Sequence, residues 1–352
     1  MNRILGWDLL RGLCALAVGG YHLSMWLDLG YFYSFGSYGV YLFFVLSGAS
    51  LMYTYGGYLE EGSFSFKKFL LLRYFRLAPL YVLLMLLVLP WKIIKEGATI
   101  ALLKKFFLNG FFVFGFFDPA ASSMLVGGWS LGIETIYYLI FPALGFCVLR
   151  TNWFFVVFFI LLVVQVWWVT STIGSPGGYL GNDIELHQPQ AFVVYFFGGC
   201  LIGYLRRKEM FPSLPNRIGL ALVAFGFLAI AAINPVNAGD ELLGVRGVVG
   251  FCVCFFLVWI ATGLRLKNRF AKAAEFLGDA TYGLYLIHPV IFFGMAWVIF
   301  PRIGWGDPLS WSLGSRLGLI LLVLALAAAL ALLSDKYFEK PIRNRAKAVF
   351  GM

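Results

Sequence analysis

The chain has 352 residues and a net charge of +10, with 61% hydrophobic and only 12% charged residues. Soluble domains of this size carry about a quarter charged residues, so this composition excludes an ordinary soluble protein. The apolar residues occur in runs of about 20, the length that crosses a bilayer as a helix. The basic residues lie in short loops between these runs, which favours contact with membrane lipid and argues against nucleic acid.

Ten membrane-spanning helices are predicted, at residues 5–27, 37–56, 74–91, 129–149, 153–172, 190–205, 217–234, 246–264, 280–300 and 313–334. The predicted fold class is therefore all-α, a polytopic transmembrane bundle of about ten spans, because helices satisfy every backbone hydrogen bond within lipid. We expect residues 1–352 to form a single integral membrane domain. The first apolar run carries Asp8 and Arg11, so we expect it to be retained rather than removed as a signal peptide.

The distribution of lysine and arginine predicts the orientation. With the N-terminus in the cytoplasm, both termini are cytoplasmic and all but seven of the 27 basic residues lie inside, as the positive-inside rule requires. The seven are Lys92, Lys95, Lys104, Lys105, Arg246, Arg302 and Arg316. We interpret segment 92–128, with its apolar FFLNGFFVFGFF stretch, as an amphipathic or re-entrant element on the outer face, because an eleventh span would reverse everything after it.

The first span contains RGLCALAVGGYH, with Arg11 and His22 at its ends. Eleven residues turn a helix to about 20° beyond three full turns and advance it by about 16 Å, so both side chains project from one face. Asp8 lies within about 40° of the same stripe. Charged groups inside a bilayer are costly and usually functional. The alternative is that Arg11 reaches the inner headgroups and His22 is a hydrogen-bonded packing residue.

Three further polar groups interrupt later spans. Arg73 and Arg76 are neighbours at the start of the third span, where they are either lipid anchors or a clamp for an anion.

Glu134 follows Trp129 and Ser130 in the fourth span, at a depth similar to that of His22, and we expect it to orient that imidazole, directly or through a network. In the ninth span, His288 shares a helix face with Tyr285. Because Pro289 follows His288, a structural role at a kink is an equal alternative.

No metal site is expected. The outer loop NDIELH holds Asp183, Glu185 and His187, which we interpret as a solvated loop near the substrate rather than a metal site. The five cysteines show no zinc-site spacing and are interpreted as small packing residues.

Six motifs follow one another along the chain: WDLLRGLCALAVGGYH, GVYLFFVLSGASL, LLRYFRLAPLY, WSLGIETIYYLIFP, YGLYLIHPV and FEKPIR. In this order they resemble the acyltransferase family 3 membrane proteins, which include bacterial O-acetyltransferases of cell-surface glycans. The first is similar to that family's Arg-x10-His signature, the third to its Arg-x-x-Arg motif and the fourth to its Trp-Ser-Leu-x-x-Glu motif. Tyr41 stands where the family often has an acidic residue, and the loops match poorly. The chain resembles the stand-alone ten-span form without an SGNH-type esterase domain.

The resemblance implies an O-acyltransferase of the bacterial inner membrane. It would move an acyl group, acetyl by default, from cytoplasmic acyl-CoA to a hydroxyl of an extracytoplasmic carbohydrate or glycolipid. The residue spacing fits this activity. Arg73, Arg76 and Arg11 are expected to hold the phosphates of the donor, and His22, about 16 Å farther along its helix, is expected to act as general base on the acceptor.

The remaining site residues are assigned supporting roles. Glu134 would orient His22 or stabilise its cation, and Asp8 would pair with Arg11 when no donor is bound. Ser47 and Ser130 are candidate carriers of a covalent acyl group, although direct transfer does not need one.

Two other functions fit the same chain. A transporter or flippase for a glycan or lipid would also need buried charges, but such proteins usually contain internal repeats, and none is visible here. An acyl shuttle would hand its group to a separate periplasmic transferase, which would then be a partner.

Overall fold

The computed structural model describes residues 3–211 and 213–350, and leaves out the side chains of residues 151, 179–180 and 183–184. Within these ranges it contains helices and one isolated β-bridge, between Leu214 and Leu264, but no β-strand. The all-α prediction is confirmed. The long helices are α1 (Leu5–Trp26), α2 (Tyr33–Glu60), α3 (Phe66–Glu96), α6 (Trp129–Leu149), α7 (Thr151–Gly174), α10 (Val193–Arg207), α11 (Asn216–Ala232), α12 (Gly244–Gly263), α13 (Asn268–Gly294) and α15 (Leu313–Ser334).

Each predicted span coincides with one of these helices, but several helices are longer than their apolar runs. The second, predicted at 37–56, covers Tyr33–Glu60, and the third, predicted at 74–91, covers Phe66–Glu96. Backbone hydrogen bonding continues past the end of an apolar run, so helix ends and apolar ends differ. Among the described residues, seven helices are long and apolar enough to cross a membrane. The total of ten spans stays a prediction.

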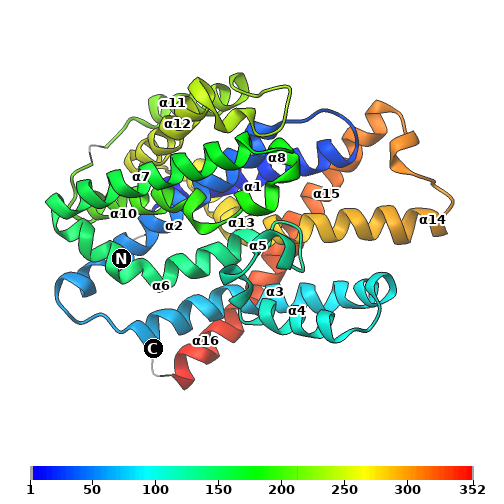
Figure 1. Ribbon diagram of the computed structural model, residues 1–352, viewed down its shortest axis with the longest axis horizontal. Coiled ribbons are helices and arrows are strands. Elements are labelled where there is room, and N and C mark those ends of the chain that lie inside the picture. The colour runs from blue at the N-terminus through cyan, green and yellow to red at the C-terminus, as the bar shows by residue number, and fades with distance from the viewer. Residues whose placement is uncertain (1–2, 212, 351–352) are drawn as a thin grey trace.

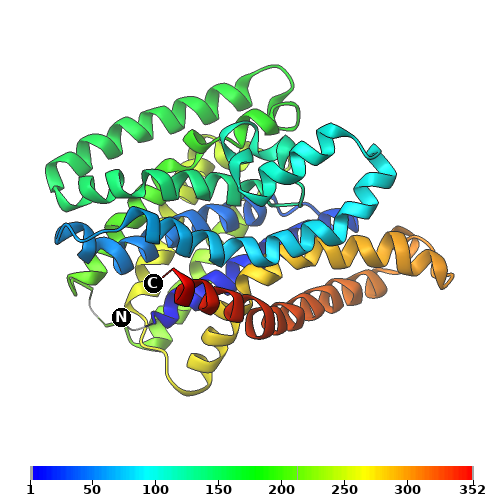
Figure 2. The same ribbon diagram turned by 90° about the horizontal axis from the view of Figure 1, so that it is seen from below.

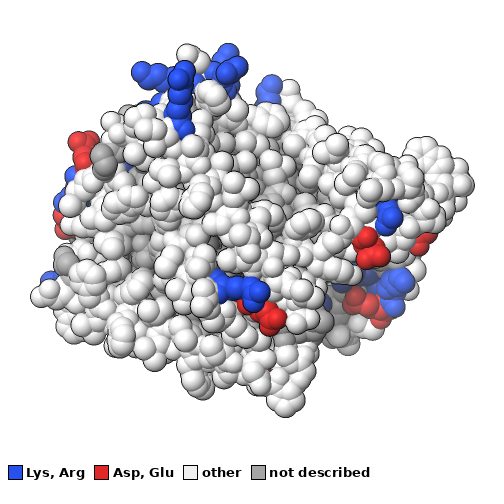
Figure 3. Space-filling model, turned by 90° about the horizontal axis from the view of Figure 1, so that it is seen from above, with Lys and Arg blue, Asp and Glu red and all other residues white. Residues whose placement is uncertain are grey.

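Both chain termini lie at one end of the bundle, on the left of Figure 1, whereas α4 (Ile100–Gly110) and α14 (Phe300–Arg302) lie at the other. We call these the terminal end and the distal end. Helix α1 is central and packs against α2, α12, α13 and α15. Helices α3 and α13 run beside each other in Figure 2 and are in contact. The face drawn in Figure 3 consists mostly of uncharged residues, with charged side chains gathered in a few groups, as suits a surface in lipid.

Helices α2 and α10 touch backbone to backbone. A Cβ atom added to Gly199 would lie 2.1 Å from the carbonyl oxygen of Val45, and one added to Gly48 would lie 2.0 Å from that of Phe196. Only glycine fits at these positions, and such small residues let membrane helices approach closely. This contact fixes the rotation of α2 and therefore the direction of its polar face.

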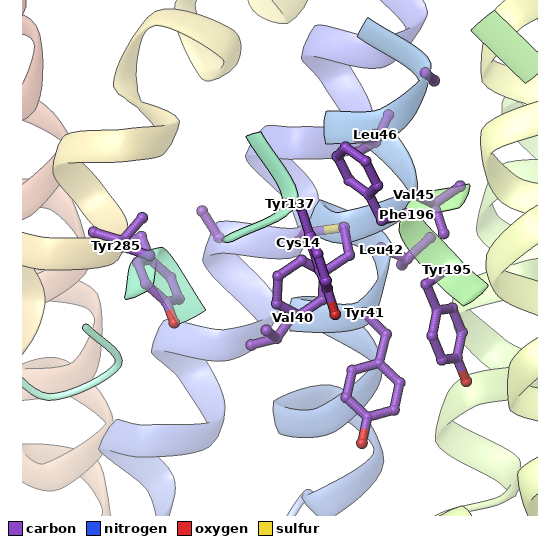
Figure 4. Packing of buried hydrophobic residues seen from close by; sticks show 14 of the residues in the cluster. Cys14, Val40, Tyr41, Leu42, Val45, Leu46, Tyr137, Tyr195, Phe196 and Tyr285 are labelled. Atoms are coloured by element: carbon purple, nitrogen blue, oxygen red, sulfur yellow. The ribbon is translucent and has the colours of Figure 1, made fainter. Parts of the chain in front are cut away.

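Aromatic side chains fill the space beside the contact between α2 and α10. The rings of Tyr41 and Tyr195 lie 4.9 Å apart, and Tyr137 stacks on Phe196 at the same distance. Figure 4 shows these rings on one side of α1 and Tyr285 on the other.

The segment between α3 and α6 forms the short helices α4 (Ile100–Gly110), η1 (Val113–Phe116) and α5 (Pro119–Ser122). Helix α4 has 11 residues, too few to cross a bilayer. The sequence predicted that this segment is not an eleventh span, and the short helices agree. Figure 1 shows α4 toward the distal end.

Buried Asn109 holds this segment in place. Its Oδ1 accepts hydrogen bonds from the hydroxyl of Tyr81 at 2.7 Å and from the backbone N–H of Met124 at 3.0 Å. The segment also docks on α6, because a Cβ on Gly115 would lie 2.2 Å from the carbonyl oxygen of Gly132. These contacts position the start of α6, which carries several of the predicted site residues.

Candidate active site

A cavity of about 490 Å³ lies between α1, α2, α3, α6 and α13. This volume is typical of a ligand pocket. The cavity begins among residues near the terminal end and reaches inward to Ser130 and Tyr285. Its charged lining is four arginines and two carboxylates, Arg3, Arg11, Arg73, Arg76, Asp8 and Glu134. The excess of positive charge favours an anionic ligand.

Helix α1 contributes an ion-pair network to the cavity. Oδ1 of Asp8 lies 3.1 Å from Nη1 of Arg11, which is the pairing that the sequence analysis expected. Asp8 also pairs with Arg3, which in turn lies 2.9 Å from Asp279. The other Nη of Arg11 donates a hydrogen bond to Ser50. Arg11 is therefore fixed by this network and presents its charge in one position.

The two arginines of α3 differ in their surroundings. Nη2 of Arg73 donates to the hydroxyl of Tyr55 at 3.0 Å, and its guanidinium lies over the Tyr55 ring. Nε of Arg73 is buried and has no hydrogen-bond partner among the described residues. Arg76 is exposed and makes no hydrogen bond or ion pair with the part of the chain that the structure describes. Both arginines line the cavity with donors that a bound anion could use.

Glu134 lies in the cavity but not beside His22. Its Oε1 accepts a hydrogen bond from Ser47 at 2.6 Å. The ring of His22 is instead in contact with His288. The expectation that Glu134 orients His22 is thus not met by direct contact. The reason is the packing of the bundle, since α1 packs on α13 whereas α6 packs on α2 and α10.

Ser130 and Tyr285 close the deep end of the cavity together. Their hydroxyl oxygens lie 3.0 Å apart, and each lies 2.9 Å from the carbonyl oxygen of Gly127. Gly127 has φ of +75°, a conformation that favours glycine, and a Cβ there would meet the Tyr285 hydroxyl at 2.9 Å. The turn before α6 is therefore built around this contact.

Trp129 is separated from the cavity. Its ring lies 4.1 Å from that of His187, in the loop before α10. The side chain of Asp183, from the same loop, lies outside the described residues. No group of three histidine, cysteine or acidic residues among the described residues is placed to hold a metal ion.

His22 and His288 form a pair beyond the cavity, and neither lines it. Nδ1 of His22 lies 3.1 Å from Nε2 of His288, and Nδ1 of His288 lies 2.9 Å from the carbonyl oxygen of Leu284. A carbonyl only accepts, so a neutral His288 carries its proton on Nδ1 and accepts at Nε2 from His22. A neutral His22 then carries its proton on Nδ1, and its Nε2 presents a lone pair.

Sequence reasoning missed several residues of α2 that line the cavity or hold its arginines. Ser50 holds Arg11, Tyr55 holds Arg73, and Thr54 also lines the cavity. A signal for two of them was present, because positions 47, 50 and 54 repeat as i, i+3 and i+7 and so share one helix face. That polar face within an apolar span marks the wall of the cavity.

Comparisons with known proteins identify relatives of this chain. The model of the family described as "Acyltransferase domain" matches residues 4–334. The chain is 27% identical to the "Putative peptidoglycan O-acetyltransferase YrhL" of Bacillus subtilis, over 97% of the chain and 55% of that protein. It is 26% identical to "Peptidoglycan O-acetyltransferase OatA" of Listeria monocytogenes, over 96% of the chain and 55% of that protein. It is 24% identical to "O-acetyltransferase OatA" of Staphylococcus aureus, over 98% of the chain and 58% of that protein.

The chain thus spans about half the length of the curated relatives that it matches. No solved structure matches it. The resemblance stated from the six motifs is confirmed by the family match.

Proposed function

Because this chain belongs to the acyltransferase domain family, we propose that it is a membrane O-acyltransferase using acyl-CoA as donor and a carbohydrate hydroxyl as acceptor. Acetyl is the proposed acyl group, since the relatives named above are O-acetyltransferases. A cell-surface glycan or glycolipid is the proposed acceptor, and the terminal end is taken as the cytoplasmic face of a bacterial inner membrane. The observation that carries the proposal is a cationic cavity with a histidine pair beyond its deep end.

The donor enters at the terminal end in this proposal. Arg76 is exposed, and the buried Nε of Arg73 has no partner within the described part of the chain, so both can bind the phosphates of CoA. Arg11 lies farther in and adds positive charge behind them. The pantetheine arm is long and thin, and a cavity of about 490 Å³ suits it better than the whole nucleotide. The hydroxyls of Ser47 and Ser130 would bind its amides.

The thioester must pass the deep end of the cavity to reach the histidines. Tyr285 lines the cavity, and His288 lies one helical turn farther along α13. If the Tyr285 hydroxyl separated from Gly127 and Ser130, the cavity would open toward the histidine pair. Those contacts are hydrogen bonds of the Tyr285 hydroxyl. An amide or the thioester carbonyl of the acyl-CoA can form hydrogen bonds in their place.

Transfer then proceeds by general base catalysis at His22. Its Nε2 takes the proton of the acceptor hydroxyl while that oxygen bonds to the thioester carbon. The carbon–sulfur bond breaks, and the CoA thiolate receives the proton from the imidazolium. His288 acts as a positioning residue, because it accepts from Nδ1 of His22 and so keeps the lone pair on Nε2. Glu134 and Asp8 balance the charge of the arginines and hold Ser47 and Arg11 in place.

The test uses purified protein in nanodiscs and measures acetyl-CoA binding and acetyl transfer separately. We expect His22→Ala to bind acetyl-CoA normally and to lose transfer by a factor of about 10² or more. Arg73→Ala should weaken binding. A His22→Ala protein that still transfers at the normal rate would remove the base from the proposal. Wild-type protein that binds no acyl-CoA would favour a transporter instead.

A further inference from the structure

A row of aromatic rings leads from His22 toward the distal end. Trp26 stacks on His22 with ring centres 5.2 Å apart and planes 9° apart. Phe293 lies 4.6 Å from Trp26, Trp297 lies 4.3 Å from Phe293, and Trp91 lies 5.3 Å from Trp297. We call Trp26, Phe293, Trp297 and Trp91 the aromatic stripe. It is built from α1, α13 and α3, and it begins on the opposite side of the histidine pair from the donor cavity.

The stripe offers hydrogen-bond donors as well as ring faces. The indole N–H groups of Trp26, Trp91 and Trp297 make no hydrogen bond to the described part of the chain. The indole N–H groups of Trp7, Trp168 and Trp311 do donate to protein oxygens, that of Trp7 to Thr262 at 2.8 Å. Trp297 is 51% exposed, so its ring can be reached from outside.

The backbone around Trp297 departs from regular α-helical geometry. Residues Met295–Ile299 form a π-helical turn, η4, at the end of α13. A π-helical turn inserts an extra residue, changes the direction of the side chains after it, and occurs frequently at functional sites. Trp297 is in this turn and reaches Trp91 of α3 with planes only 22° apart. The irregular turn therefore lets two helices share one stack of rings.

An interfacial belt of tryptophan is the simplest alternative, because indoles anchor membrane proteins at the headgroups. The rings of belt residues lie at the level of the headgroups. The aromatic stripe instead continues inward through half-buried Phe293 and Trp26 to an imidazole whose Nε2 has no partner among the described residues. A ligand lying on these rings would present its groups directly to that nitrogen.

We infer that the aromatic stripe is the acceptor subsite, where a sugar ring of the glycan stacks on Trp26, Phe293 and Trp297 with one hydroxyl at His22. This inference rests on the proposed function and names the surface that its acceptor occupies. One face of a pyranose presents C–H groups with partial positive charge, which match the negative face of an aromatic ring. Its hydroxyls can accept from the free indole N–H groups. Donor and acceptor thus approach His22 from opposite ends of the bundle.

The experiment compares Trp297→Leu with Trp167→Leu in wild-type background. Trp167 is 62% exposed on α7 and is the matched control for a lipid-facing tryptophan. Binding of chitotetraose and of soluble muropeptides is measured without donor, and acetyl transfer and acetyl-CoA binding are measured in parallel. We expect Trp297→Leu to weaken glycan binding and to raise its KM by about tenfold, with acetyl-CoA binding unchanged. Trp297→Tyr should restore most of the binding.

The possible outcomes distinguish a failure of this inference from a failure of the proposed transferase function. Equal glycan binding by wild type, Trp297→Leu and Trp167→Leu would overturn the subsite even if transfer occurs. So would an equal loss in both leucine variants, which would indicate a lipid anchor. Glycan binding that depends on Trp297, in a protein that transfers nothing, would support the subsite and remove only the transferase activity.

Discussion

Nδ1 of His22 lies 3.1 Å from Nε2 of His288, although 266 residues separate the two in the chain. The second imidazole is 1% exposed and is tied to the carbonyl oxygen of Leu284. The pair is therefore a directed chain of hydrogen bonds, in which one tautomer of each ring satisfies both contacts.

This relationship predicts the effect of replacing His288. His288→Ala removes the acceptor for Nδ1 of His22, so the imidazole can take either tautomer and its Nε2 lone pair is no longer enforced. We expect kcat to fall by about 10–100-fold while the KM for acetyl-CoA changes little. His288→Gln, whose carbonyl can accept the same hydrogen bond, should recover part of the rate. Equal losses in both variants, or a loss of acetyl-CoA binding, would assign His288 a packing role.

The free cation at Arg76 predicts a selective loss of donor affinity. Arg76→Ala removes a charge that has no hydrogen bond or ion pair within the described chain, so folding should be unaffected. We expect the Kd for acetyl-CoA to rise about tenfold and its dependence on salt to weaken. Arg345→Ala is the control, because Arg345 is exposed at the same end of the molecule and does not line the cavity. A similar loss in both variants would indicate general attraction to a basic surface.

The contact between α2 and α10 predicts a stability change at one glycine. Gly199→Ala places a Cβ 2.1 Å from the carbonyl oxygen of Val45, which forces the helices apart. We expect the free energy of unfolding to fall by about 1–3 kcal/mol, measured as a lower thermal midpoint in detergent. Gly318→Ala, on an exposed face of α15 with nothing within 4 Å, should leave the midpoint unchanged or raise it. Equal midpoints for the two variants would contradict the close approach.

A pH dependence is predicted for the loop before α12. Burial raises the pKa of the Glu241 carboxyl above its ordinary value. Since the folded-state pKa is the higher one, the stabilising contribution is complete below the ordinary pKa and is lost as the pH rises through the raised value.

The variant Glu241→Gln should abolish that slope. An amide can donate to the Ser37 oxygen and accept from the Gly239 N–H, so both hydrogen bonds of the carboxyl are kept. The measurement is the thermal midpoint of both proteins as a function of pH. Parallel curves for wild type and variant would exclude Glu241 as the titrating group.

The amino-acid sequence by itself determined the helices, the polar face of the first span and the position of Arg73 and Arg76 as neighbours on one helix. These follow from local rules, because the length of an apolar run and the 3.6-residue period act within one helix. The likeness to an acyltransferase family also came from the motifs, and the family match confirms it.

Only the tertiary structure decided which helices pack together and which of their side chains meet. It paired His22 with His288 rather than with Glu134, placed Glu134 beside Ser47, and ended the cavity at Tyr285. It also joined Trp26, Trp91 and Trp297 from three helices into one stripe. The physical reason is that the rotation and neighbours of a helix are set by side-chain packing between distant segments, such as the fit of Gly199 against Val45, and no local pattern encodes that choice.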